Sequence, residues 1–276
     1  MPREYEAIRT EVVGRVAVLT LHNPERMNAL SGRMSEELRE AVLEFDTDDN
    51  IGAFVLTGAG RAFCAGADVK GWGNAIAQGE AGNDMERRAR ETRANSDESW
   101  TELWQRVKPV VIAYNGDSVG AGLTITLGAD YRIASERARL SMRFARMGVT
   151  PELQSSRLLP QITGLSKALD MMLTGELFPA EKALAYGLVD EVVPHEDLMQ
   201  RATTKAAQYA KLHPETTRAV KQLVHANLFE PETTEVKLRE RTTFATAQRT
   251  FSHKEAVQAF IEKREPDFYT GRPATP

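Results

Sequence analysis

An alternation of short apolar segments with helical ones, up to about Pro151, limits the fold of this chain more than any other feature. The first two apolar segments, 5–13 and 15–22, predict a β-hairpin. A helix is expected next, because apolar residues recur there at helical spacing: Met34, Leu38, Val42 and Phe45. Four further apolar segments have the length of buried strands: 52–58, 107–115, 131–135 and 138–142. Strands that alternate with helices are typical of an α/β fold.

Helical segments replace this alternation after about Pro151. They cover 151–159, 164–173, 179–186, 196–211, 214–228, 232–249 and 252–264. One strand candidate, 190–193, lies among them. We therefore expect an α/β core over residues 1–195 and a helical C-terminal region over 196–276. The polar segment 72–106 is predicted to be a long excursion with at least one helix, and such excursions are often functional lids.

The composition narrows the choice of partner and compartment. The 276 residues carry a net charge of −4 with the two signs mixed, which argues against a nucleic-acid partner. The lone cysteine, Cys64, can form no internal disulfide, so a reducing, cytoplasmic compartment is expected. The first 14 residues lack the features of a secretory signal, and no stretch approaches the ~20 apolar residues of a membrane span.

Two glycine-rich segments, 57–70 and 115–130, are the first candidates for a site. Each follows a predicted strand and leads toward a predicted helix. Small residues let the backbone approach a ligand closely, and helix N-termini present unpaired N–H groups. Two such turns that face each other could direct two N–H groups at one oxygen, which is an oxyanion hole. Tight packing after a strand is the structural alternative, and neither segment matches a nucleotide-binding motif.

Side chains that bind metals or act as nucleophiles give no comparable pattern. The five histidines are scattered and share no motif with a serine or cysteine nucleophile. No spacing of metal ligands is present, so no metal site is expected. Cys64 stands among small residues and is interpreted as a packing residue.

Five segments in a fixed order carry a resemblance to a known family. They are HNPERMNALS, GRAFCAGADVK, KPVVIAYNGDSVGAGLTITLGADYRIAS, LTGELFPAEKALAYGLVDEVVP and AFIEKREPDF. Together they resemble the crotonase superfamily, also called the enoyl-CoA hydratase/isomerase family, from about residue 5 to 268. The resemblance implies an α/β spiral of ββα units, C-terminal helices that build trimers or hexamers, and acyl-CoA thioester substrates. Coenzyme A would be part of the substrate, so no separate cofactor is expected.

The resemblance also assigns residues to the site. The two backbone donors of the family's oxyanion hole correspond to Ala67 and Ala121. The family usually has glycine at the second place, but alanine keeps the N–H group. Residues that resemble the family's substrate contacts are Arg26, Met27, Ala29, Ala65, Asp68, Val69, Gly122, Phe144 and Lys263. Lys263 would reach coenzyme A phosphates, with a solvated surface lysine as the alternative.

The acids decide which reaction the resemblance implies. Hydratases of the family use two glutamates, and this chain has Thr124 and Phe144 at those places. The segment GVTPELQSS instead resembles the loop of Δ3,Δ2-enoyl-CoA isomerases, in which a single glutamate is the base. That residue is Glu152 here. A buried base beside an acyl chain should have a raised pKa.

Alternatives to an enoyl-CoA isomerase stay open. Thr150 and Pro151 could begin a helix whose dipole Glu152 complements, worth about 0.3–1 kcal/mol. Asp117, beside the second glycine-rich turn, could serve as the acid of a hydratase or thioester hydrolase. A catalytically silent acyl-CoA-binding scaffold is the third possibility, because binding alone needs no acid.

Overall fold

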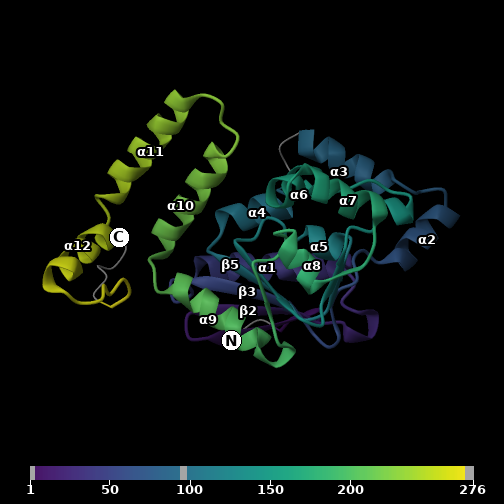
Figure 1. Ribbon diagram of the computed structural model, residues 1–276, viewed down its shortest axis with the longest axis horizontal. Coiled ribbons are helices and arrows are strands. Elements are labelled where there is room, and N and C mark those ends of the chain that lie inside the picture. Colours follow the sequence, from purple (N-terminus) through teal and green to yellow (C-terminus); the bar gives the residue numbers. More distant parts are fainter. Residues whose placement is uncertain (1–3, 94–97, 271–276) are drawn as a thin grey trace.

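Two stacked β-sheets form the centre of the protein in a computed structural model that describes residues 4–93 and 98–270 (Figure 1). The larger sheet has the order β1-β2-β3-β5-β7-β10. Its strands are β1 Ile8–Val13, β2 Val16–Leu21, β3 Ala53–Gly58, β5 Val110–Tyr114, β7 Tyr131–Ser135 and β10 Glu191–Val193. The smaller sheet has the order β4-β6-β8-β9. Its strands are β4 Ala62–Cys64, β6 Asp117–Val119, β8 Arg139–Ser141 and β9 Phe178–Pro179.

Helices surround the sheets and form the C-terminal part. The N-terminal ones are α1 Gly32–Thr47, α2 Val69–Ala77, α3 Asn83–Arg93, α4 Trp100–Arg106 and α5 Ala121–Thr124. The later ones are α6 Ser155–Thr163, α7 Leu165–Thr174, α8 Ala180–Ala185, α9 Leu198–Ala210, α10 Pro214–Asn227, α11 Thr233–Ala247 and α12 Phe251–Glu262. The predicted hairpin is confirmed as the antiparallel pair β1–β2.

From β3 to β8, successive strands alternate between the two sheets. The strands β3, β5 and β7 pair in parallel in the large sheet, and each is followed directly by a short strand of the small sheet, β4, β6 or β8. This alternation confirms the predicted α/β spiral of ββα units. The short strands β4 and β6 went unrecognised within the glycine-rich segments, because three residues carry no readable periodicity, whereas β8 lies within the predicted strand 138–142.

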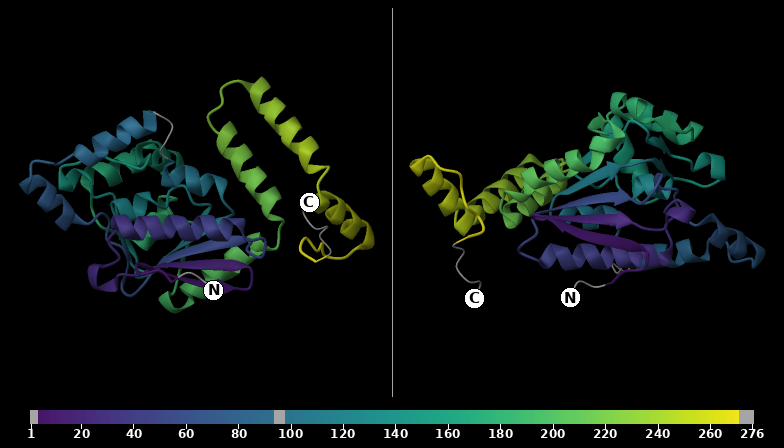
Figure 2. Two further views of the ribbon diagram at one scale, coloured as in Figure 1. Left: turned by 180° about the vertical axis from the view of Figure 1, so that it is seen from behind. Right: turned by 90° about the horizontal axis from the view of Figure 1, so that it is seen from below.

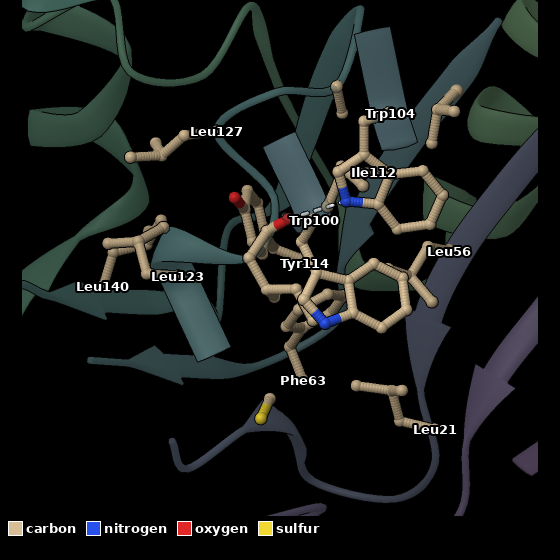
Figure 3. Close-up of a cluster of buried hydrophobic side chains, with 14 of the residues drawn as sticks. Leu21, Leu56, Phe63, Trp100, Trp104, Ile112, Tyr114, Leu123, Leu127 and Leu140 are labelled. Carbon is tan, nitrogen blue, oxygen red and sulfur yellow. Dashed lines mark hydrogen bonds between the residues drawn. The ribbon is translucent and has the colours of Figure 1, made fainter. Parts of the chain in front are cut away.

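A core of large side chains fills the space between the two sheets and helices α4 and α5 (Figure 3). Phe63 of β4 packs edge-on against Tyr114 of β5, with ring centroids 4.9 Å apart. Trp100 and Trp104 of α4 lie in the same cluster, and the indole N–H of Trp104 donates to the Ile125 carbonyl at 2.7 Å. The buried indole thus binds α4 to the segment that follows α5.

Helix α9 covers the opposite face of the large sheet. Its buried face presents Leu198 and three alanines, Ala202, Ala206 and Ala210, to the strands. Alanines let the helix approach closely: a Cβ added to Gly52 would lie 2.6 Å from the Ala210 Cα. The helix therefore packs on the α/β part although it lies in the predicted C-terminal region. The division at residues 195 and 196 stays a prediction.

Buried charges attach α10 to the core. The ammonium of Lys221 is 2.7 Å from an Asp130 carboxylate oxygen and donates to the Trp104 carbonyl at 2.8 Å. Burial lowers the pKa of Lys221, and the charge of Asp130 opposes that shift. Arg218, one turn earlier, pairs with Asp46 at 3.0 Å. These ion pairs fix the angle at which α10 leaves the sheet.

The helices α10, α11 and α12 extend to one side of the α/β part (Figures 1 and 2). Helix α11 buries no residue within the chain. Large apolar side chains on these helices are exposed: Val220, Val224, Leu238, Phe244, Val257, Phe260 and Ile261. Large exposed apolar patches are uncommon on soluble monomers and often mark interaction sites. No helix within the described ranges is long and apolar enough to cross a membrane.

Substitution of Lys221 by methionine should loosen α10. The change leaves the Asp130 carboxylate and the Trp104 carbonyl without their buried partner, and breaking such a pair typically costs about 3–5 kcal/mol. We expect a lower free energy of unfolding in urea and faster amide exchange in α10. Lys237→Met on the exposed face of α11 is the control and should change neither. Equal exchange in α10 of Lys221→Met and the unmutated protein would contradict this role.

Candidate functional site

The two glycine-rich turns touch each other, as the oxyanion-hole hypothesis requires. Gly66 has φ 93°, and a Cβ built on it would lie 2.6 Å from the Val119 carbonyl oxygen and 3.6 Å from the Ala121 nitrogen. A Cβ added to Gly122 would lie 2.5 Å from the Cys64 carbonyl oxygen. A side chain at either glycine would therefore force the turns apart.

Ala67 and Ala121 occupy matching places in this contact. Ala67 directly follows Gly66, and Ala121 is the first residue of α5, whose N–H groups have no partner within the helix. Gly120 turns the chain into α5 with φ 53° and ψ −121°. Within residues 4–93 and 98–270, neither the Ala67 nor the Ala121 N–H donates a described hydrogen bond. The contact thus brings two unused donors onto adjoining turns.

A buried asparagine fastens the N-terminal loop to the first turn. Asn28 is fully buried, and its side-chain amide donates to the carbonyls of Ala59 and Ala62 at 2.9 and 2.8 Å. The Ala65 N–H also donates to the Met27 carbonyl at 2.9 Å. Sequence reasoning missed Asn28, since its one signal was a second asparagine in a short polar loop.

The predicted coenzyme A contacts lie mostly along this junction. Arg26 pairs with Asp68 at 3.0 Å, and both side chains are partly exposed. Met27, Ala29 and Ala65 lie between them in the hydrogen-bonded loop, while Val69 is exposed at the start of α2 and Gly122 is buried at the contact.

Two predicted contacts lie apart from this junction. Phe144 is 6% exposed and belongs to the core. Lys263 is exposed at the end of α12, away from the α/β part of the same chain (Figure 1).

Glu152 lies in a loop, and the predicted helix start at residue 151 is wrong. Helix α6 begins at Ser155 with Gln154 as its N-cap. Leu153 and Gln154 have φ angles of 49° and 61°, so two successive non-glycine residues adopt the left-handed region. Each such residue costs of order 1–2 kcal/mol, and strain of this kind concentrates at functional sites. Glu152 is thus not in the first turn of α6, and its carboxyl group is hydrogen-bonded to Thr124 of α5 instead of the first N–H groups of α6.

Residues of the excursion hold this strained loop. The Thr101 hydroxyl of α4 donates to the Leu153 carbonyl at 3.3 Å. The Gln154 side-chain amide donates to the Ser99 hydroxyl at 3.0 Å. The segment 72–106 thus reaches the loop of the candidate acid through the N-terminus of α4.

The Glu152 carboxyl group faces α5. Its Oε1 accepts a hydrogen bond from the Thr124 hydroxyl at 2.6 Å, and Thr124 is three residues after Ala121. Burial raises the pKa of Glu152, while the Thr124 hydrogen bond and the charge of Arg88 oppose the shift. A carboxyl group with a raised pKa next to possible oxyanion donors is suited to proton transfer.

The competing candidates are occupied or inert. Both carboxylate oxygens of Asp117 bind the Arg139 guanidinium, at 2.9 and 2.7 Å. Burial raises the pKa of the Cys64 thiol to about 12, so it stays protonated and packs as predicted. Among the described residues, no group of three or more His, Cys, Asp or Glu could hold a metal ion.

The alternating sheets and the paired glycine turns define a protein of the crotonase fold. A family model described as enoyl-CoA hydratase/isomerase matches residues 11–271. The chain belongs to the enoyl-CoA hydratase/isomerase family, whose enzymes act on acyl-CoA thioesters.

Individual relatives cover nearly the whole chain. A probable enoyl-CoA hydratase of Rhodobacter capsulatus is 36% identical over 97% of this chain and 99% of its own length. The 1,2-epoxyphenylacetyl-CoA isomerase of Escherichia coli is 33% identical over 97% of this chain and 99% of its own. The crystal structure of a putative enoyl-CoA hydratase/isomerase from Mycobacterium abscessus is similar with a TM-score of 0.82 and 33% identity, covering 96% of this chain and 100% of that one.

Substitution of Gly122 by alanine should damage activity more than stability. The added methyl group displaces the Cys64 carbonyl and separates the two turns, and loss of one oxyanion donor lowers kcat by about 10²–10³-fold. The measurement is turnover of an enoyl-CoA thioester, together with thermal unfolding.

Gly52→Ala is the matched control. Its methyl group meets the Ala210 backbone, a comparably tight contact that is remote from the turns. This variant should lose stability and keep kcat. Equal kcat losses in the two variants would show that the effect is general loosening of the core.

Proposed function

We propose that this protein is an enoyl-CoA isomerase in which Glu152 is the single proton-transferring group. The observation that carries the proposal is the Glu152 carboxyl group, which is partly buried and lies 2.6 Å from the hydroxyl of Thr124 on the helix that begins at Ala121. An isomerisation needs one group that takes and returns a proton. A hydration needs an acid–base system that also holds water.

The proposed reaction moves one proton and two electron pairs. The Glu152 carboxylate removes a proton from C2 of a 3-enoyl-CoA, and the electrons of the C2–H bond form an enolate on the thioester oxygen. The N–H groups of Ala67 and Ala121 would hold that oxygen in the oxyanion hole. As the enolate collapses, C2 and C3 become doubly bonded and the C3–C4 double bond takes the proton back from Glu152 at C4. The product is the 2-enoyl-CoA.

Coenzyme A recognition is assigned to the loop that joins the first turn. Arg26 and Asp68 flank it with partly exposed charges, and Met27 supplies the carbonyl that binds Ala65. Ala29, Val69 and Gly122 complete the proposed substrate contacts of one chain. Phe144 is proposed as an apolar wall. Lys263 is proposed to reach the phosphates of a coenzyme A bound to a neighbouring subunit, because it ends α12, which lies to one side of the α/β part of its own chain (Figure 1).

Hydration is the second candidate function, and the names of relatives favour it. The Rhodobacter capsulatus relative is named a probable hydratase, whereas the Escherichia coli relative is named an isomerase. Against hydration stands the absence of a carboxylate at Thr124 and Phe144, the places of the two hydratase glutamates. The remaining alternatives are a thioester hydrolase and a catalytically silent acyl-CoA-binding protein.

Glu152→Gln should lower isomerisation by at least about 10²-fold, because the amide keeps the shape but cannot take a proton. The assay incubates cis-3-enoyl-CoA and 2-enoyl-CoA separately and follows conjugation by absorbance and water addition by mass. Acyl-CoA binding should hardly change. Asp117→Asn is the control and should stay active; the reverse pattern would move the role to Asp117. Water addition by the unmutated protein, with no double-bond shift, would establish the hydratase.

Glu152→Gln should also make the folded protein more stable near neutral pH. The pKa of Glu152 is raised by burial above its ordinary value of 4.5, so the folded state holds this proton more tightly than the unfolded state. Stability therefore falls as pH rises from about 4.5 through the raised pKa, and the glutamine variant escapes that loss. Urea unfolding at several pH values should show the variant's advantage at neutral pH and its disappearance in acid. A lower stability of the variant at neutral pH would restore a structural role for the acid.

A homotrimer, alone or paired as a hexamer, is the proposed assembly. Phe260 on α12 is 85% exposed in the single chain, and the neighbouring helices add further apolar surface. Light scattering should give three or six chain masses for the unmutated protein. Phe260→Asp together with Phe244→Asp should shift it toward monomer, whereas Arg137→Asp, at an exposed position between β7 and β8 and outside the last three helices, should not. A monomer at micromolar concentration in the unmutated protein would contradict this assembly.

A further inference from the structure

The Thr124 hydroxyl has a specific relation to the candidate base. It donates to Oε1 of Glu152 at 2.6 Å, and Thr124 is only 1% exposed. In the described part of the chain, the other carboxylate oxygen, Oε2, has no hydrogen-bond partner. Oε2 is also not among the fully enclosed polar atoms without a partner. The two oxygens of one carboxyl group are therefore unequal: one is held and the other is free.

We propose that Thr124 is a positioning residue that holds Oε1 of Glu152 and so makes Oε2 the oxygen that exchanges the proton with the substrate. The inference rests on the proposed function and adds a division of labour within the carboxyl group. While Glu152 is ionised, Oε1 accepts the Thr124 hydrogen bond as part of a carboxylate. Once Oε2 has taken the C2 proton, Oε1 becomes a carbonyl oxygen and still accepts the same hydrogen bond. The contact survives both halves of the reaction, so the carboxyl group need not rotate between them.

Thr124 lies on α5, the helix that also carries the proposed oxyanion donor Ala121. Its hydrogen bond to Glu152 therefore positions the base relative to that donor. Helix α5 spans Ala121–Thr124, so the proposed donor and the hydroxyl are at the two ends of one short helical turn. A β-branched side chain in a helix has few χ1 rotamers, which limits the movement of the hydroxyl. The Thr124 hydroxyl also lies 3.4 Å from the Ala121 carbonyl, a weaker acceptor than a carboxylate. The distance between enolate oxygen and base is thereby set within one element.

Thr124→Val and Thr124→Ser test this role. Valine keeps the shape and removes the hydrogen bond, whereas serine keeps the hydroxyl. A hydrogen bond to a carboxylate favours the ionised form, so valine should raise the pKa of Glu152 further. We expect kcat to fall about 10-fold or more, KM to change little, and the acidic limb of the pH–rate profile to move to higher pH by about one unit. Serine should restore both kcat and the position of the limb.

Direct titration of Glu152 separates this inference from the proposed function. The carboxyl band is isolated by infrared difference between each protein and its Glu152→Gln counterpart, which requires no turnover. If the valine variant titrates at higher pH while the unmutated protein shows no isomerisation, the positioning role stands and the isomerase proposal fails. If isomerisation proceeds but valine leaves the titration and the acidic limb unchanged, the positioning role is overturned. Equal losses of kcat in the valine and serine variants, with no shift of the limb, would also overturn it, since they indicate packing alone.

Discussion

The site depends on direct backbone contact between two turns, which is possible because each turn has a glycine at the point of contact. Gly66 abuts the Val119 carbonyl, and Gly122 abuts the Cys64 carbonyl, so each turn uses a glycine to approach the other. Sheet pairing brings the turns together, because β4 and β6, which carry them, are parallel neighbours in the small sheet. A spiral that alternates between sheets thus has a chemical consequence: adjacent repeats place equivalent backbone amides side by side.

How accurately the sequence predicted each strand or helix depended on the length of its periodic apolar pattern. Strands with five or six apolar residues and helices with repeated apolar faces were predicted close to their bounds, as α1 and β3 illustrate. The start of α6 was missed because Thr150 and Pro151 resemble a helix start, whereas tertiary contacts hold Leu153 and Gln154 at positive φ. The partnership of Thr124 with Glu152 could not be predicted, since a hydrogen bond between residues 28 positions apart leaves no local pattern.

Electrostatics divides the ionisable groups of the core into two kinds. Lys221 and Asp130 pair with each other and attach a helix, so their charges are compensated where they are buried. Glu152 has a hydroxyl partner and, among the described residues, forms no ion pair; burial raises its pKa, and the charge of Arg88 opposes that shift. A neutral side chain would be less costly to bury at this position. The presence of a carboxyl group there, in a strained loop, is the pattern expected where the requirements of catalysis oppose stability.

The position of α9 has a consequence for folding during synthesis. All strands of both sheets, the two glycine turns and the acid loop precede Leu198, and α9 closes the open face of the large sheet by Ala210. An emerging chain can therefore complete its α/β unit before the last three helices leave the ribosome, because domains fold as units from the N-terminal side. The apolar surfaces of α11 and α12 appear only on a molecule whose interior is already closed. Synthesis from the N-terminus thus shortens the time for which these exposed apolar side chains coexist with an unfolded α/β core.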